Sequence, residues 1–74
     1  MSWNHRLLLK DGVVDIVECY YNPEGALVGY CNACAVGCPD LEVPDQVMVI
    51  QEQLQQMLES CQKPVLRPKD FIYP

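Results

Sequence analysis

Two predominantly apolar runs flank Asp11-Gly12 in the first third of the chain. An Asp-Gly pair favours the type I′ turn of a two-residue hairpin, because both central positions of that turn need a positive φ. The pattern therefore predicts antiparallel strands over about 3–10 and 13–21. Since a two-residue turn also fixes the register, the expected cross-strand pairs are Lys10 with Val13, Leu9 with Val14, Leu7 with Ile16, His5 with Glu18, and Trp3 with Tyr20.

A second turn is predicted at Asn22-Pro23-Glu24-Gly25, where proline suits the first central position and glycine can adopt a left-handed conformation. It leads into a third strand over about 26–36, which completes an antiparallel meander. A three-residue bulged loop would place Tyr20 near Val28, Glu18 near Tyr30, and Ile16 near Asn32.

From Pro44 onward the spacing of apolar residues changes from two to 3.6, which predicts an amphipathic helix over about 45–62. The tail, 63–74, contains three prolines and is expected to be extended. The sequence thus predicts a single α+β domain over 1–74: a three-stranded meander, one helix and a proline-rich tail. The apolar stripe of the helix comprises Val47, Ile50, Leu54, Met57, Leu58 and Cys61, with Gln46, Gln53, Gln55, Gln56 and Glu59 opposite.

Both faces of the predicted sheet are apolar. We call the side with Trp3, His5 and Tyr20 the aromatic face, and the side with Leu8 and Cys19 the core face. One helix can cover only one face, and the smaller side chains of the core face favour that side. The exposed aromatic face would then meet a second copy or a partner protein; the alternative is a monomer in which the tail folds back over it. The predicted aromatic face comprises Trp3, His5, Leu7, Leu9, Val14, Ile16, Glu18, Tyr20, Val28 and Tyr30.

Length and charge narrow the function classes. A chain of 74 residues removes only roughly 60% of its unfolded surface from water on folding. Additional stabilisation by a second subunit, a metal or disulfides is therefore expected. A net charge of -5 disfavours direct nucleic-acid binding. No apolar run approaches a membrane span, the first residues are too polar for a signal peptide, and five cysteines are an odd count for a disulfide framework. A cytoplasmic protein is expected, in a bacterium or a phage-infected cell.

The cysteines Cys31, Cys34 and Cys38, the last followed by Pro39, match the last three ligands of a bacterial ferredoxin run, and Val28 stands at the first ligand position. Strand alternation would place Cys31 and Cys34 on opposite faces, which argues against a shared ion. We therefore expect no cofactor and free or buried thiols. The alternative is zinc or an iron-sulfur cluster, with a fourth ligand from Cys19, Cys61 or His5.

The predicted contacts for a ligand or partner are aromatic rings and polar side chains at or beside the aromatic face, because rings and arginine commonly carry binding energy. His5 opposite Glu18 is the only pair that resembles a general acid-base pair. Because no nucleophile or phosphate-binding loop accompanies it, no catalysis is expected. The predicted binding residues are Trp3, His5, Arg6, Glu18, Tyr20 and Tyr30.

Three segments, Trp3–Arg6, Glu18–Gly25 and Met57–Leu66, together resemble a family of small uncharacterised proteins of bacteria and their phages. In that family tyrosine usually stands at the position of His5, valine at that of Cys19, and an acidic stretch without thiols at 31–38, so the resemblance implies no shared metal. The β-β-β-α order is also similar to that of HicB antitoxins, a likeness of architecture alone.

These features lead to one main hypothesis and two alternatives. The main hypothesis is a non-catalytic, dimeric binding protein of phage type. It would act as an inhibitor, in the manner of an anti-defence protein, by occupying a partner protein or by sequestering a small nucleotide-like ligand. In the second case, arginine would bind the phosphate and an aromatic ring would stack on the base. The alternatives are a small zinc or iron-sulfur protein and an antitoxin-like module.

Overall fold

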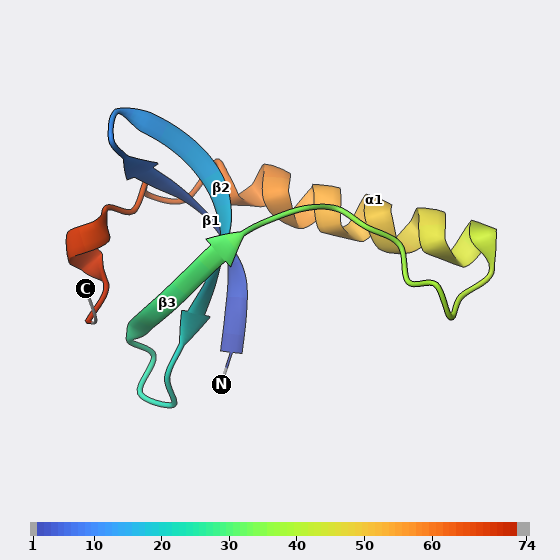
Figure 1. Cartoon of the computed structure of the whole chain (residues 1–74), viewed down its shortest axis with the longest axis horizontal. Coiled ribbons are helices and arrows are strands. Elements are labelled where there is room, and N and C mark those ends of the chain that lie inside the picture. Colours follow the sequence, from blue (N-terminus) through green and yellow to red (C-terminus); the bar gives the residue numbers. More distant parts are fainter. Residues whose placement is uncertain (1, 73–74) are drawn as a thin grey trace.

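The computed structural model describes residues 2–72, in which three antiparallel strands form one open sheet that a single long helix follows (Figure 1). The strand order is β1-β2-β3. This arrangement confirms the predicted α+β meander. The elements are β1 (Ser2–Lys10), β2 (Val13–Tyr21), β3 (Leu27–Asn32), α1 (Val43–Ser60) and the short 3-10 helix η1 (Pro68–Asp70).

The β1-β2 hairpin has the predicted turn and register. Asp11 and Gly12 have φ values of 53° and 79°, as a type I′ turn requires. Lys10 pairs with Val13, His5 with Glu18, and Trp3 with Tyr20, and the other predicted pairs of this ladder are also present. The two-residue loop thus leaves the hairpin only one register.

The second turn is also where it was expected, but the register beyond it is shifted by one residue. Asn22 Oδ1 accepts hydrogen bonds from the backbone N–H groups of Glu24 (3.1 Å) and Ala26 (2.9 Å). Tyr21 then pairs with Leu27, whereas Tyr20 pairs with Gly29, so Val28 is an extra residue in the ladder. Such a bulge moves every later side chain to the other face.

This shift corrects two face assignments. The prediction that Glu18 lies near Tyr30 is wrong: Glu18 pairs with Cys31, and Tyr30 pairs with Cys19. Tyr30 therefore belongs to the core face and Cys31 to the aromatic face. The third strand also ends at Asn32 rather than near 36, because the chain leaves the sheet to run along α1.

The hydrophobic core lies on the core face, and the tail covers it. Leu8, Val17 and Cys19 are buried there with Leu66, whose backbone pairs with β1: the Leu9 N–H donates to the Leu66 carbonyl and the Leu66 N–H to the Leu7 carbonyl, each at 2.9 Å. The expectation that the helix would cover this face is thus wrong. The described part of the tail has no regular structure apart from the Leu66 bridge and the 3-10 helix at 68–70. Leu66 belongs to the core and Phe71 packs against it, whereas Val65 and Ile72 are exposed.

Beyond Leu66 the tail continues across the core face to its far edge. Phe71 packs on the Tyr30 ring, with centroids 5.3 Å apart, and the Ile72 N–H donates to the Leu27 carbonyl at 2.9 Å. Between these points the Arg67 N–H donates to Asp70 Oδ2 at 2.8 Å and closes η1. Two edges of the sheet are therefore tied together by one segment.

Helix α1 contacts the sheet only near its C-terminal end, and its N-terminal half projects away from it (Figure 1). Pro44 lies in the first turn, which tolerates proline because those N–H groups have no helical partner. The segment 33–42 runs back along the projecting half and is held by glutamines. Gln53 accepts from the Val36 N–H (3.1 Å) and donates to the Val36 carbonyl (2.8 Å), and Gln46 donates to the Leu41 carbonyl (2.9 Å).

Over residues 2–72, no helix combines the length and the apolar character needed to cross a membrane.

Candidate ligand site between the sheet and the helix

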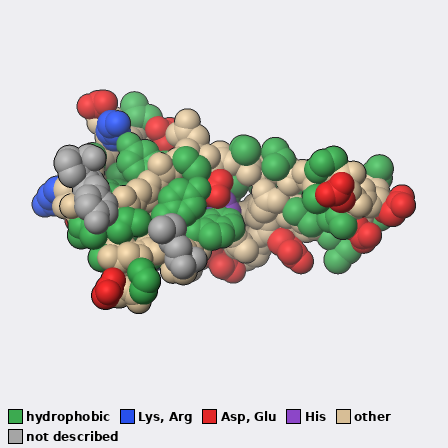
Figure 2. All heavy atoms as spheres, turned by 60° about the horizontal axis from the view of Figure 1, so that its bottom comes forward, with side chains coloured by type: hydrophobic (Ala, Val, Ile, Leu, Met, Phe, Trp, Pro, Cys, Tyr) green, Lys and Arg blue, Asp and Glu red, His purple; other side chains and the backbone are tan. Residues whose placement is uncertain are grey.

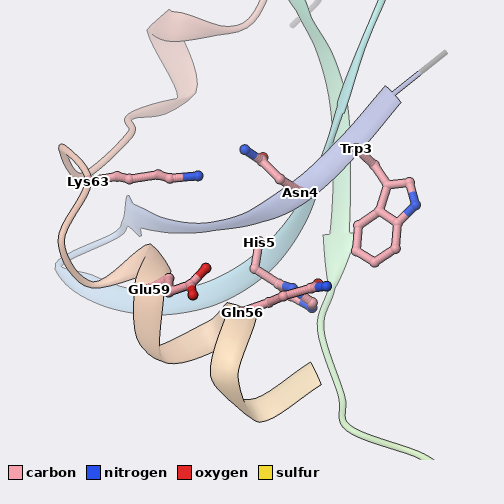
Figure 3. Close-up of a pocket in the computed structure, with 6 residues that line it drawn as sticks. All are labelled: Trp3, Asn4, His5, Gln56, Glu59 and Lys63. Atoms are coloured by element: carbon pink, nitrogen blue, oxygen red, sulfur yellow. The ribbon is translucent and has the colours of Figure 1, made fainter. Parts of the chain in front are cut away.

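A pocket of about 240 Å³ lies where the C-terminal end of α1 meets β1. One wall comes from β1 and the other from the end of α1 and the residues that follow it (Figure 3). Because β1 leads in from the N-terminus and α1 ends far along the chain, the site exists only in the folded protein. Its lining residues are Trp3, Asn4, His5, Gln56, Glu59 and Lys63.

His5 is the most buried member of the pocket. Its side chain is on the aromatic face, and only 4% of the residue is exposed. Its Nδ1 atom is buried and has no hydrogen-bond partner among residues 2–72. A buried polar atom without a partner costs stability, so the large majority of such atoms in folded proteins are paired. Among the pocket-lining residues, His5 is therefore the one with a buried side-chain nitrogen that lacks a hydrogen-bond partner.

Trp3 provides an aromatic surface beside this histidine. Its ring contacts His5 edge to face, with centroids 5.3 Å apart and an angle of 79° between the planes. Half of the Trp3 residue stays exposed despite this contact. A half-exposed indole offers a flat face to a second planar group.

The rest of the pocket is polar and carries both signs of charge. Asn4 and Gln56 contribute side-chain amides, which both donate and accept hydrogen bonds. Glu59 and Lys63 lie one helical turn apart in sequence, and Figure 3 shows the Lys63 side chain extending toward β1 beside Asn4. The site thus offers a stacking surface, hydrogen-bonding edges, one carboxylate and one ammonium group within a small volume.

The structure brings together some of the predicted binding residues and separates others. Trp3 and His5 line the pocket, and Tyr20 and Glu18 follow on the aromatic face of the neighbouring strand. Glu18 is opposite His5 in the ladder as predicted, but it does not pair with His5 Nδ1. Tyr30 lies on the core face against Phe71.

Arg6 has a structural partner set on the core face. Its Nη2 donates to the Pro64 carbonyl at 2.8 Å, and its Nη1 donates to the Tyr21 hydroxyl at 3.5 Å. Tyr21 in turn donates to Asn4 Oδ1 at 2.8 Å. Arg6 thus anchors the start of the tail, and through Tyr21 it orients an amide that lines the pocket.

Four of the lining residues were missed from the sequence: Asn4, Gln56, Glu59 and Lys63. Gln56 and Glu59 were assigned to the solvent face of the helix, which is correct for the helix alone. Glu59 and Lys63 do fall within the Met57–Leu66 segment on which the family resemblance rests. That segment was the available signal, although nothing in it shows that it meets β1.

The thiols do not form a cluster. Among residues 2–72, no three side chains of the metal-binding types His, Cys, Asp and Glu gather closely enough to hold a metal ion. Cys31 and Cys34 are exposed, and Cys19 is buried in the core, where burial raises the pKa of its thiol. Cys31 instead forms a hydrogen bond of 2.9 Å with the Tyr20 hydroxyl.

This bond leads to a prediction for the ionisation of Tyr20. The hydrogen bond to Cys31 raises the pKa of Tyr20 from 10.0 to about 12, with smaller contributions from desolvation and from charge on Cys31 and Glu18. Since the folded pKa lies above the unfolded one, the protonated phenol contributes stability below pH 10, and that contribution is lost as the pH rises through about 12. We expect Cys31→Ala to bring the Tyr20 pKa back toward 10, as measured by ultraviolet absorbance titration.

The matched control for this titration is Cys34→Ala, which removes an exposed thiol with no bond to Tyr20. A late-ionising tyrosine that persists in Cys31→Ala would contradict the assignment.

Comparison of the chain with protein-family models, with curated proteins and with solved structures found no match. The resemblances to a phage-type family and to HicB architecture therefore stay predictions. The pocket and the exposed surfaces are the observations from which a function can be argued.

Proposed function

We propose that this protein is a small non-catalytic binding protein that sequesters a nucleotide-like ligand in the pocket between β1 and the end of α1. The observation that carries the proposal is His5: an imidazole with 4% exposure, whose Nδ1 lacks a partner, at the wall of a pocket. A ligand that enters the pocket and turns the His5 ring, whose Nδ1 is covered in the free protein, would give this unpaired atom a partner.

The pocket chemistry matches a nucleobase with a phosphate. A volume of about 240 Å³ accepts a base-sized group rather than a large ligand. The Trp3 indole can stack on a planar ring, and the Gln56 amide suits its hydrogen-bonding edge, whereas Asn4 Oδ1 is already bonded to Tyr21. The Lys63 ammonium suits a phosphate, which would remain at the solvent side.

Charge supports a small ligand over a polymer. The whole chain carries -5, which disfavours a polyanion such as DNA or RNA. A single local cation can still hold one phosphate, because the interaction acts over a short range and more distant charges are screened.

The proposed mode of action is stoichiometric capture. Among the pocket-lining residues, His5 and Glu59 are the groups that could act as a base, and none is a serine or cysteine nucleophile. A protein that binds a ligand without converting it lowers the free ligand concentration, and so inhibits any receptor that reads that ligand. This matches the inhibitor role expected from the sequence.

The test is calorimetric titration with nucleosides, nucleoside monophosphates, cyclic nucleotides and dinucleotides, with chromatography of the ligand afterwards. We expect a phosphate-bearing ligand to bind and to be recovered unchanged. Trp3→Ala should weaken binding of nucleosides and nucleotides alike by roughly fivefold to 150-fold, because stacking of a base on an aromatic side chain is worth about 1 to 3 kcal/mol. Lys63→Gln should weaken only the ligands that carry a phosphate.

Two control variants accompany these. Val14→Ala truncates another half-exposed residue of the same sheet face, and Lys69→Gln removes a cation from η1, away from the pocket lining. Both should bind as the unmodified protein does. Absence of binding across the panel, or conversion of the ligand, would overturn the proposal.

A further inference from the structure

The helix α1 exposes an apolar stripe that nothing in the described chain covers. We define the α1 stripe as Val43, Val47, Leu54 and Leu58, which are 71%, 48%, 52% and 61% exposed. At about 100° per residue these four positions fall within an arc of about 60° on the helix. Figure 2 shows hydrophobic side chains along the projecting part of the molecule as well as over the sheet.

The chain covers a different flank of the same helix. Gln46 and Gln53 bind the 33–42 segment, and Ser60 is buried against the sheet end. These residues lie about a quarter turn away from the α1 stripe. The covered flank also includes the half-buried Ile50 and Met57. The α1 stripe nevertheless stays exposed, which is unusual for an apolar side of a helix whose only neighbour is its own domain.

The spacing of the α1 stripe is symmetric. Successive members are separated by 4, 7 and 4 positions, so that the stripe reads the same from either end about a centre between Ile50 and Gln51. When two such helices pack antiparallel about a twofold axis, Val43 meets Leu58 of the other copy and Val47 meets Leu54. A surface that matches itself under a twofold rotation is what an isologous dimer requires.

Charge selects the antiparallel direction. All five Lys and Arg residues lie within 6–10 and 63–69, whereas the segment leading into α1 and its first turn carry Asp40, Glu42 and Asp45. A parallel pair would bring these three carboxylates against their own copies. An antiparallel pair separates them and also opposes the two helix dipoles favourably.

We infer that a second copy of this chain occupies the α1 stripe, giving a twofold dimer in which the two α1 helices pack antiparallel with Val47 of each facing Leu54 of the other. This interface is separate from the ligand pocket, because Gln56 and Glu59 lie on the other side of the helix. The dimer and the ligand site can therefore be tested independently.

The experiment is sedimentation equilibrium over a concentration series, with far-UV circular dichroism to confirm folding. The unmodified protein should have the mass of a dimer that dissociates on dilution. Leu54→Glu should raise the dissociation constant by at least roughly tenfold, because it places a carboxylate in an apolar contact. Met48→Glu is the matched control: Met48 is equally exposed, at 57%, but lies off the α1 stripe, so the dimer should persist.

A charge pair then tests the direction. In the double variant Val47→Lys, Leu54→Glu, an antiparallel dimer brings each new lysine against a new glutamate and should recover much of the lost affinity, whereas a parallel dimer would set like charges together. A monomer in the unmodified protein at all concentrations, disruption by Met48→Glu as strong as by Leu54→Glu, or no recovery in the double variant would overturn the inference. The first outcome does not depend on any variant folding.

Discussion

Replacing Leu66 with alanine should lower the free energy of unfolding by about 2 to 4 kcal/mol, the usual loss for a buried leucine. Leu66 is 8% exposed and packs with Leu8, Val17 and Cys19. Its backbone bonds to Leu7 and Leu9 do not need the leucine side chain, so the loss reports packing alone. For a domain of 74 residues, whose total stability is of the order of 5 kcal/mol, this would leave about 1 to 3 kcal/mol and an unfolded fraction of roughly 0.5 to 15%.

Urea unfolding followed by circular dichroism measures the effect. The control is Val65→Ala, in which the neighbouring residue is 44% exposed and should change stability by about 0.5 kcal/mol or less. Equal losses in the two variants would mean that the tail is not the cover of the core face.

The effect is large because so little else covers that face. The helix, which a β-β-β-α order would ordinarily place on the core, contacts the sheet only near one end and on the aromatic face. The described part of the tail, residues 63–72 with two prolines, covers this face instead. Proline limits the freedom of this segment in the unfolded chain, which reduces the entropy lost when it docks.

The parts of the fold that could be predicted from sequence are those that local chemistry decides. Asp11-Gly12 allows one turn and hence one register, so every pair between β1 and β2 was predictable. The turn at Asn22–Gly25 was equally clear, but the single extra residue at Val28 depends on how β3 meets β2, and this reversed the faces of Tyr30 and Cys31.

Only the β1 wall of the pocket could be predicted from the sequence, because local chemistry decides the hairpin but not the position of the helix. Trp3 and His5 share a strand and a face, so the hairpin register alone placed them together. Glu59 and Lys63 reach them only because α1 docks by its C-terminal end. That docking is a contact between segments far apart in the sequence, which periodicity does not encode.

His5→Phe is expected to make the protein more stable and, at the same time, unable to bind its ligand. Phenylalanine keeps a ring for the edge-to-face contact with Trp3, whose centroid is 5.3 Å away, and it removes the buried Nδ1 that has no partner among residues 2–72. Removing an unpaired buried polar atom should return about 1 to 2 kcal/mol, which raises the melting temperature by several degrees in a domain of this size. The melting temperature follows from thermal unfolding, and affinity from calorimetry with the nucleotide panel.

The two readouts separate a binding residue from a structural one. A histidine kept for packing would leave binding intact when its ring is replaced by another, whereas a histidine kept for its nitrogen would not. His5→Ala provides the contrast, because it loses both the ring and the nitrogen and should therefore lower stability as well as affinity. If His5→Phe destabilises the fold, then the gain expected from removing an unpaired Nδ1 is absent. If it binds nucleotides with unchanged affinity, then the imidazole is no part of the site. A gain in stability joined to a loss of affinity is the pattern expected when a protein retains an unfavourable buried group because function requires it.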